Sequence, residues 1–581
     1  MPKHPSVRPR LSLCALILAL SGVFIAQACD SPAKPNTNVP DKVPAAEPAK
    51  PEVTINKDAV PKDGSVQPMD VGPKSAALMM TTGFKGYTEP CGCTLDVMLG
   101  GLDRVLGYVE QAKPLYTATL VVDGGDMLFE EAEQDKNFVK LNKGKARLVM
   151  QAHKRMGTAY TVPGAKDMAL GSAFYKEMIG VGGMTPLGAN IRLDNQALKP
   201  HVLATLGEQR IGLIGAGDAS VYEGIEGIEA TAAADAVRAS VKALASQKPQ
   251  AYVVLFHGEA AAARQLLKDV PQLDFVLVGL NPRETDQSDK IANGYTLEPY
   301  DQGRYLGILK LYPKPGSDNY VSAKLGSKTE VKTIEEQIEY VEQTIKSLPP
   351  AAPGQESPLL KKMRERLASL VKEQRRLKVA KIEVPEDKSS FIWRSVPMEP
   401  GLPVNAKMAA ERSAFNKASK ADIPDIPIPK PKPGQAFYVG TEQCATCHID
   451  AANFWKKTNH AHAFETLVKR DKEYDPTCVG CHQVGYEKPG GSVVGKWTDT
   501  ATLAGNPITK DLRNVGCENC HGPGSNHIES IMKGQGKADI DRASTQTTCM
   551  SSCHVPEHSP KFNYSVYREQ ILGPGHGKPM P

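Results

Sequence analysis

The feature that most restricts how this chain can fold is a series of four cysteine pairs in its last part, each followed at once by a histidine. In chain order the four clusters are Cys444-Ala-Thr-Cys447-His448, Cys478-Val-Gly-Cys481-His482, Cys517-Glu-Asn-Cys520-His521 and Cys549-Met-Ser-Ser-Cys553-His554. Two thiols three positions apart can form thioethers with the two vinyl groups of one haem, while the adjacent histidine reaches one axial face of the iron. A zinc ribbon or a disulfide framework would use the same cysteine pairs, but neither explains a histidine after every second cysteine. The clusters therefore predict covalently bound haem c, about four groups per chain.

The fourth cluster differs from the other three because three residues, rather than two, separate its cysteines. We predict a haem at this cluster as well, and the alternative is an unoccupied cysteine pair.

The supply of histidine in the same region agrees with several haems. Nine of the thirteen histidines lie there, and four of the nine directly follow the cysteine pairs as expected proximal ligands. The other five are candidates for the second axial position: His460, His462, His527, His558 and His576. A haem with two histidine ligands suits electron transfer, whereas a haem without the second ligand is open to a small molecule. Each of the five could instead be a surface histidine, above all His558.

The segments around the clusters resemble the tetrahaem cytochrome c554 family. They read WKKTNHAHAFETL, CVGCHQVGYEKPGG, NVGCENCHGPGSNH and CHVPEHSPKF, and the resemblance covers residues 436–581. It implies a mostly helical, loop-rich domain in which closely spaced porphyrins fill much of the core. It also implies that one haem can be open, as in some members.

The first residues predict export. Basic residues precede an apolar run at 11–26, and Ala28-Cys29 follows, which is the layout of a signal peptide at 1–28. The small residue before Cys29 resembles the lipobox of bacterial lipoproteins, so we expect Cys29 to be acylated and the chain to be anchored to a membrane of the bacterial envelope, on the periplasmic side or at the cell surface. Cleaved secretion without a lipid is the alternative. Residues 29–73 are rich in Pro and Lys and have few large apolar side chains, so we expect a disordered tether.

Composition excludes other classes. With 41% apolar and 23% charged residues and a net charge of +5 over 581 residues, the chain is an ordinary globular protein. Its basic residues are interleaved with acidic ones, which gives nucleic-acid binding no support.

Residues 74–325 alternate apolar runs with amphipathic stretches. The expected strands are AALMM, TATLVVDGGD, YTVPG, RIGLIGAGD, AYVVLFHG and DFVLVGL. Residues 137–156 and 231–245 read as helices between them, the second with Thr231 as its N-cap. Such alternation favours an α/β fold whose sheets are covered by helices.

The strand ends resemble the calcineurin-like metallophosphoesterases, especially the 5′-nucleotidase branch. TTGFKGYTEP, GGLDR, VVDGGD, PGAKD, GANI, VVLFHG, VGLNP and GRYLGILKL follow in the order of that family, and the resemblance implies a β-sandwich flanked by helices. It also implies a pair of metal ions held by Asp, His and Asn side chains. Of that set only Asp126 and His257 remain; the other positions hold Gly83, Lys85, Ala165, Lys166, Leu280 and Pro282. Two ligands cannot hold a dinuclear site, so we expect no phosphoesterase activity.

Cys91-Gly92-Cys93 lies eight residues past Gly83. Three readings stay open for it: a disulfide or inert thiols, a redox-active pair, or a thiophilic metal site together with Asp126 and His257.

Residues 326–385 predict an antiparallel helical hairpin, because apolar side chains recur at spacings of three and four on both sides of a Pro-rich turn. The hairpin could also mediate self-association. Residues 386–435 then read as a connector that ends in the stiff, Pro-rich segment IPDIPIPKPKPG.

Together these features predict a multidomain electron-transfer protein that exchanges electrons with other redox proteins of the envelope. The alternatives are a redox enzyme acting on a small nitrogen or sulfur compound at an open haem, and a hydrolase at a residual metal site around Asp126 and His257.

Overall fold

The structure is a computed structural model, and its described residues lie between 74 and 576. It leaves out 92–97, 284, 286–287, 318, 324–330, 332–333, 336, 340, 343–344, 346–357, 380–383, 537–539, 542–543, 552, 556–558, 560–561 and 574–575. The expected signal peptide, Cys29 and the tether therefore lie outside the described residues, as do Cys93 and His558. All the described residues fall within one compact unit, 55–581. Among them, no helix combines the length and the apolar composition that crossing a membrane requires.

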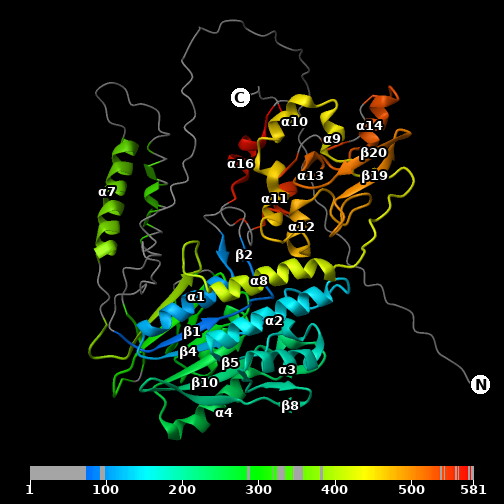
Figure 1. Cartoon of the computed structure of the whole chain (residues 1–581). Helices are drawn as coiled ribbons and strands as arrows, with labels where there is room; N and C mark the ends of the chain where they lie inside the picture. The colour runs from blue at the N-terminus through cyan, green and yellow to red at the C-terminus, as the bar shows by residue number, and fades with distance from the viewer. Residues whose placement is uncertain are drawn as a thin grey trace, which may run out of the picture. The chain divides into compact units, whose positions relative to one another are not determined.

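The first large sheet has seven strands in the order β17-β18-β16-β1-β4-β5-β6. Figure 1 labels β1, β4 and β5 of this sheet. Strands β1, β4, β5 and β6 are parallel, whereas β16 runs antiparallel to β1 and β18 runs antiparallel to β16. Their bounds are Ala77–Thr81 (β1), Thr119–Asp123 (β4), Thr158–Thr161 (β5), Thr185–Pro186 (β6), Tyr305–Tyr312 (β16), Val321–Ser322 (β17) and Ser390–Pro397 (β18).

The second large sheet has six strands in the order β14-β15-β13-β12-β10-β9. Strands β10, β12, β13 and β15 are parallel, which matches their nearly continuous apolar sequences. The bounds are His201–Leu206 (β9), Gln209–Gly217 (β10), Ala251–His257 (β12), Phe275–Val278 (β13), Asp289–Ile291 (β14) and Gly294–Leu297 (β15). All six expected strands are thus confirmed, in β1, β4, β5, β10, β12 and β13.

The two large sheets pack face to face, because alternate residues of the second sheet enter different apolar clusters. Leu213, Val253 and Leu255 join the core of the first sheet, whereas their neighbours Ile214 and Val254 pack with helices α4 and α5. The helices of this α/β domain are α1 (Leu102–Ala112), α2 (Val139–Met156), α3 (Gly171–Gly182), α4 (Ala233–Leu244) and α5 (Ala260–Asp269). The expected sandwich flanked by helices is confirmed. The N-cap of α4 is Ala232 rather than Thr231, and no side chain caps that helix.

Smaller sheets complete the chain: β11 (Ile228–Ala230) with β7 (Ile191–Leu193) and β8 (Gln196–Ala197), β2 (Pro90–Cys91) with β3 (Leu99–Gly100), and β19 (Thr498–Leu503) with β20 (Asn506–Asp511).

The α/β domain extends past the expected boundary at residue 325. Strand β18 pairs with β16 over eight residues, and helix α8 (Ala406–Ser419) lies beside α1 and α2 (Figure 1). At Gly144 of α2 an added Cβ would lie 2.3 Å from the ring of Phe415, so only a glycine permits this close approach of α8. Residues 390–419 are therefore part of the α/β domain rather than of a connector.

The expected hairpin is described in part. Helix α7 (Pro358–Val379) is continuous, and Gln374 in its apolar stripe donates a hydrogen bond to the carboxylate of Glu335 at 3.1 Å. Its turn, 346–357, lies outside the described residues.

The described part of the C-terminal domain, 436–581, consists of short helices, loops and the β19–β20 hairpin. The helices are α9 (Thr441–Ala445), α10 (Ile449–Trp455), α11 (Ala463–Val468), α12 (Pro476–His482), α13 (Cys517–His521), α14 (Ser525–Met532), α15 (Gln546–Met550) and α16 (Tyr564–Ile571). Of the largest fully buried side chains in the described part of the protein, only Lys510 belongs to this domain. A domain with so few large buried side chains needs another group to fill its core.

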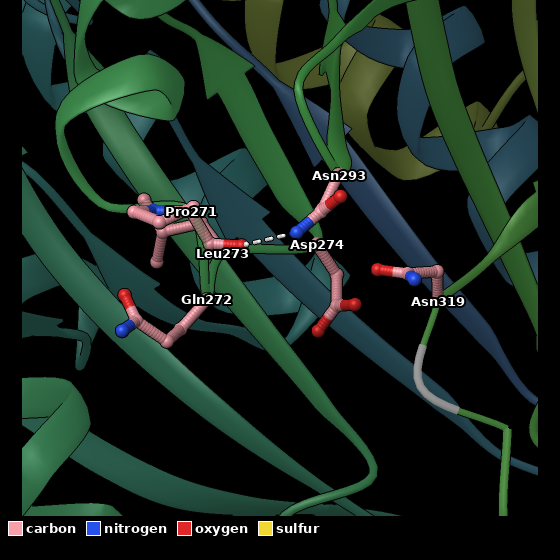
Figure 2. A pocket seen from close by; sticks show the side chains of 6 residues that line it. All are labelled: Pro271, Gln272, Leu273, Asp274, Asn293 and Asn319. Carbon is pink, nitrogen blue, oxygen red and sulfur yellow. Dashed lines mark hydrogen bonds between the residues drawn. The ribbon is translucent and has the colours of Figure 1, made fainter.

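A small hollow at one end of the second sheet holds a carboxyl group with an altered pKa. Figure 2 shows that Pro271, Leu273, Asp274, Asn293 and Asn319 surround it. Burial raises the pKa of Asp274 to about 7, although its carboxylate accepts a hydrogen bond from Tyr252 N at 2.8 Å.

We expect Asp274 to make the α/β domain less stable as the pH rises. Because the folded pKa lies above the ordinary value of 3.8, the folded state holds its proton more tightly than the unfolded state does. The free energy of unfolding should therefore fall between about pH 4 and pH 7 and level off above. In Asp274→Asn this part of the slope should vanish, as measured by urea unfolding at a series of pH values. An unchanged slope would refute the assignment.

Candidate haem-attachment sites

The second and third clusters lie wholly on short helices, whereas the first and the fourth each have only their first cysteine on one. Helix α12 carries Cys478, Cys481 and His482, and it begins at Pro476 with Asp475 as its N-cap, whose side chain accepts from Thr477 N. Helix α13 consists of the third cluster itself, from Cys517 to His521. In the first cluster Cys444 lies on α9 and His448 caps α10.

In the fourth cluster the extra residue lies within a hydrogen-bonded turn that is one residue longer than the turn of the first cluster. In the first cluster the backbone N of His448 donates to Cys444 O at 3.0 Å, four residues back. In the fourth, the backbone N of His554 donates to Cys549 O at 2.9 Å, five residues back. In both of these clusters the histidine is thus hydrogen-bonded through its backbone to the first cysteine of its own pair, despite the different spacing.

The first and third clusters lie on neighbouring segments. Cys517 N donates to Thr441 Oγ1 of α9 at 3.3 Å, and the buried Glu518 holds the two segments together. Its carboxylate accepts from the backbone N of Val439, Gly440 and Gly524. Burial raises the pKa of Glu518, and these backbone donors oppose the rise. Groups attached at the two clusters would therefore lie next to each other.

Backbone carbonyls orient two of the proximal histidines. His482 Nδ1 lies 2.6 Å from Ala463 O, and His521 Nδ1 lies 2.7 Å from Asp541 O. A carbonyl partner requires a proton on Nδ1, which leaves Nε2 as the nitrogen that can bind a metal. Burial also lowers the pKa of His482, and iron ligation requires the neutral ring.

Two of the five additional histidines face proximal ones. The ring centroids of His460 and His554 are 6.3 Å apart, and those of His521 and His576 are 5.9 Å apart. A metal with a histidine nitrogen at about 2 Å on either side places the two ring centroids about 6 Å apart. The spacing of both pairs therefore fits two ligands of one iron.

The other additional histidines differ in their surroundings. Both ring nitrogens of His462 face local partners, Glu465 and Lys456 O, and its side chain is 57% exposed. His527 on α14 has a buried Nδ1 without a hydrogen-bond partner. A buried polar atom of this kind is expected to have a partner, so His527 is the better ligand candidate of the two.

These observations show that the residues present fit haem c. The fourth cluster keeps the backbone hydrogen bond between the histidine and the first cysteine, and two histidine pairs have the separation of axial ligands.

The two retained phosphoesterase-like residues also meet in the structure. Asp126 follows β4, and its Oδ2 lies 3.6 Å from Nε2 of His257, the last residue of β12. Lys166 N donates to Asp126 Oδ1 at 2.9 Å, so backbone takes up one of the two carboxylate oxygens. Within the part of the chain that the structure describes, no three His, Cys, Asp or Glu side chains converge as a metal site would need.

Lysines contribute charge where the resemblance implies metal ligands. Lys85 Nζ forms an ion pair with Asp301 Oδ2 at 2.6 Å, and Lys166 Nζ donates to Glu130 O. Both ammonium groups are thus paired with other residues, and neither can activate water as a metal ion does.

Comparison with known proteins covers the part of the C-terminal domain that contains the first three clusters. Residues 443–522 match the family described as cytochrome c554 and c-prime. Cytochrome c-554 of Nitrosomonas europaea is 37% identical over 106 residues, which are 16% of this chain and 40% of that relative. The chain thus spans less than half the length of this curated relative. The C-terminal domain resembles an electron-transfer protein with covalently bound haem c.

Solved structures similar to the α/β domain include phosphoesterases and related hydrolases. The sulfate thiohydrolase SoxB of Thermus thermophilus is 15% identical with a TM-score of 0.37, covering 42% of this chain and 56% of its own. The calcineurin-like phosphoesterase YfkN of Bacillus subtilis is 16% identical with a TM-score of 0.34, covering 42% and 88%. Similarity at this level carries no argument about activity.

The sequence analysis missed a buried ion cluster beside the second haem-attachment motif. Asp475 was recognisable as an N-cap because Pro476 follows it. Its partner Lys145 lies 330 residues earlier, so no local pattern could indicate the pair.

Proposed function

We propose that this chain is an exported electron-transfer protein with four haem c groups, one at each cysteine-histidine cluster. The observation that carries the proposal is that one domain brings together all four clusters, with Glu518 joining the segments of the first and third and two histidine pairs at the spacing of axial ligands. Bound haem c would supply reversible one-electron reduction.

The protein's own residues would hold and orient these groups. We assign His460 as the second ligand opposite His554, and His576 as the second ligand opposite His521, on the basis of the ring distances. Ala463 O and Asp541 O fix the orientation of His482 and His521.

The α/β domain acts in this proposal as a scaffold without hydrolytic activity, because Asp126 and His257 are too few ligands for a dinuclear centre. Export, acylation at Cys29 and electron exchange with other envelope redox proteins complete the proposal, and they are supported by the N-terminal sequence. Self-association through the hairpin at 326–385 is a further possibility that the apolar stripe of α7 supports.

A haem assay with matched spectra tests this function. The protein produced in a host that assembles c-type cytochromes should contain about four haems per chain in the pyridine haemochrome assay, with iron as the only bound metal. The spectrum of the reduced protein should not change with carbon monoxide. Two haems or fewer would contradict the proposal. A carbon monoxide shift would favour the open-haem enzyme instead, and bound zinc or manganese would favour the hydrolase.

A further inference from the structure

The helix that carries the second cysteine-histidine cluster begins at a buried ion cluster. Lys145 Nζ donates to Asp475 Oδ1 at 2.7 Å, and Lys472 Nζ donates to Asp475 Oδ2 at 3.0 Å. Lys145 lies on α2 of the α/β domain, whereas the other two residues belong to the C-terminal domain. The side chains of Lys145 and Asp475 are only 10% and 7% exposed. Burying two ammonium groups against one carboxylate is costly, so their placement beside a haem-attachment motif suggests a role other than stability.

Apolar contacts surround this ion cluster on the same interface. Phe138 is the N-cap of α2, and Leu141 lies in the first turn of that helix. Both pack in one buried cluster with Phe464, Leu467 and Val479 of the C-terminal domain. Val479 is fully buried and lies between the two cysteines of the second cluster. The second cluster is therefore the one whose surroundings the α/β domain helps to form.

More distant charges of the interface balance one another. Glu89 faces Lys472 at 3.6 Å and also forms an ion pair with Arg412, while Arg412 Nη2 lies 3.1 Å from Asp103 Oδ2. The three cations Lys145, Lys472 and Arg412 thus face the three anions Asp475, Glu89 and Asp103. Their charges balance, so the loss of Lys145 alone would leave one negative charge in excess beside the second cluster.

The field of this ion cluster reaches the sulfur that would attach the haem. Burial raises the pKa of the Cys478 thiol to about 12, Asp475 adds to the rise, and Lys472 and Lys145 oppose it. Burial alone would raise the pKa of Asp475, but Lys145 and Lys472 outweigh burial and hold it well below its usual range, so Asp475 is ionised.

We infer that Lys145 of the α/β domain is a positioning residue that raises the reduction potential of the haem at the second cluster. This inference rests on the proposed haem at Cys478 and Cys481. Reduction adds one negative charge to the haem, and a cation held in a buried, low-dielectric setting stabilises that charge. The α/β domain then contributes a charge that tunes a haem potential. In this way a phosphoesterase-like domain would take part in electron transfer.

The test is a spectroelectrochemical titration of the full-length protein with three single variants. In Lys145→Met, one of the resolved haem potentials should move down, because a cation is lost. In Asp475→Asn, one potential should move up, because an anion is lost while asparagine still caps the helix. Lys140→Met is the matched control, since Lys140 lies on the same helix with its side chain 75% exposed, and it should shift no potential. Lys145→Arg should keep the wild-type potential.

Opposite signs separate the electrostatic role from a merely structural one. If loosening of the interface were the cause, Lys145→Met and Asp475→Asn would shift the potential in the same direction. Shifts of the same sign, shifts of all haems together or the absence of any shift would overturn the inference.

A second background locates the effect. In the double variant Cys478→Ser with Cys481→Ser, the shift caused by Lys145→Met should disappear. A haem count on each sample separates the proposed haem at the second cluster from the proposed role of Lys145. If Lys145→Met keeps the full haem content but shifts no potential, only the role of Lys145 is refuted. If the double variant retains the wild-type haem content, the proposed haem at the second cluster is itself wrong.

Discussion

Replacing Cys549 and Cys553 together by serine is expected to lower the haem content from about four to about three per chain. The longer spacing of this cluster makes it the most informative one to remove. Its histidine still bonds to the first cysteine of the pair, His554 N to Cys549 O, as in the first cluster. His460 stands at the ring distance expected of a second axial ligand. The pyridine haemochrome assay relative to protein concentration measures the change.

Cys91→Ser is the matched control for this prediction, since it removes a cysteine outside the four clusters and should leave the haem content unchanged. An unchanged haem content in the double serine variant would show that the fourth cysteine pair carries no haem. A loss of more than one haem would mean that the fourth site is needed to assemble its neighbours. The ring of His554 stacks on that of Phe562, with centroids 4.0 Å apart, so this histidine also packs against a residue close to it in the sequence.

Local sequence was sufficient for the strands, and it supplies the candidate haem-attachment residues. Each expected strand is a run of apolar residues long enough to cross a buried parallel sheet, and this signal lies within the strand itself. The cysteine-histidine clusters are equally local, because both thiols and the histidine serve one haem. The remaining phosphoesterase-like residues, Asp126 and His257, lie close together because Asp126 follows β4 of the first sheet and His257 ends β12 of the second, each at the carboxyl end of its strand.

Pairing between distant segments could not be predicted in the same way. The hydrogen bonds that join Lys145 to Asp475 connect residues on either side of the whole hairpin and connector. The second axial ligands are a related case, since the sequence supplies five candidates but only the fold brings His460 to His554 and His576 to His521. The predicted N-cap Thr231 lies one residue before the observed N-cap Ala232. A difference of this size is within the usual uncertainty of a helix boundary.

The domain boundary at residue 325 was missed for the same reason. Strand β18 has a sequence of ordinary strand character, SFIWRSVP, but it follows a helical segment and pairs with β16, from which residues 313–389 separate it. A connector was therefore the simplest interpretation of residues 386–435. The structure shows that Phe391 of β18 packs against Phe275 and Tyr295 of the other sheet, which explains why this segment belongs to the α/β domain.

Phe391→Ala is expected to cost about 3 to 5 kcal/mol of α/β-domain stability. The side chain of Phe391 on β18 is fully buried. It meets the rings of Phe275 and Tyr295 edge-on, with centroids 4.9 and 4.6 Å away, and both of those residues belong to the other sheet. Truncation would therefore leave a cavity between the two sheets at a strand that sequence reasoning placed outside the domain.

Urea unfolding followed by far-UV circular dichroism measures this loss as a lower midpoint of the α/β-domain transition. Phe391→Leu should cost less, because it keeps more of the buried volume. Val404→Ala, at a side chain that is 53% exposed, is the surface control and should change stability by less than about 0.5 kcal/mol. If Phe391→Ala behaved like this control, β18 would contribute nothing to the sandwich, and residues 386–435 would be a connector after all.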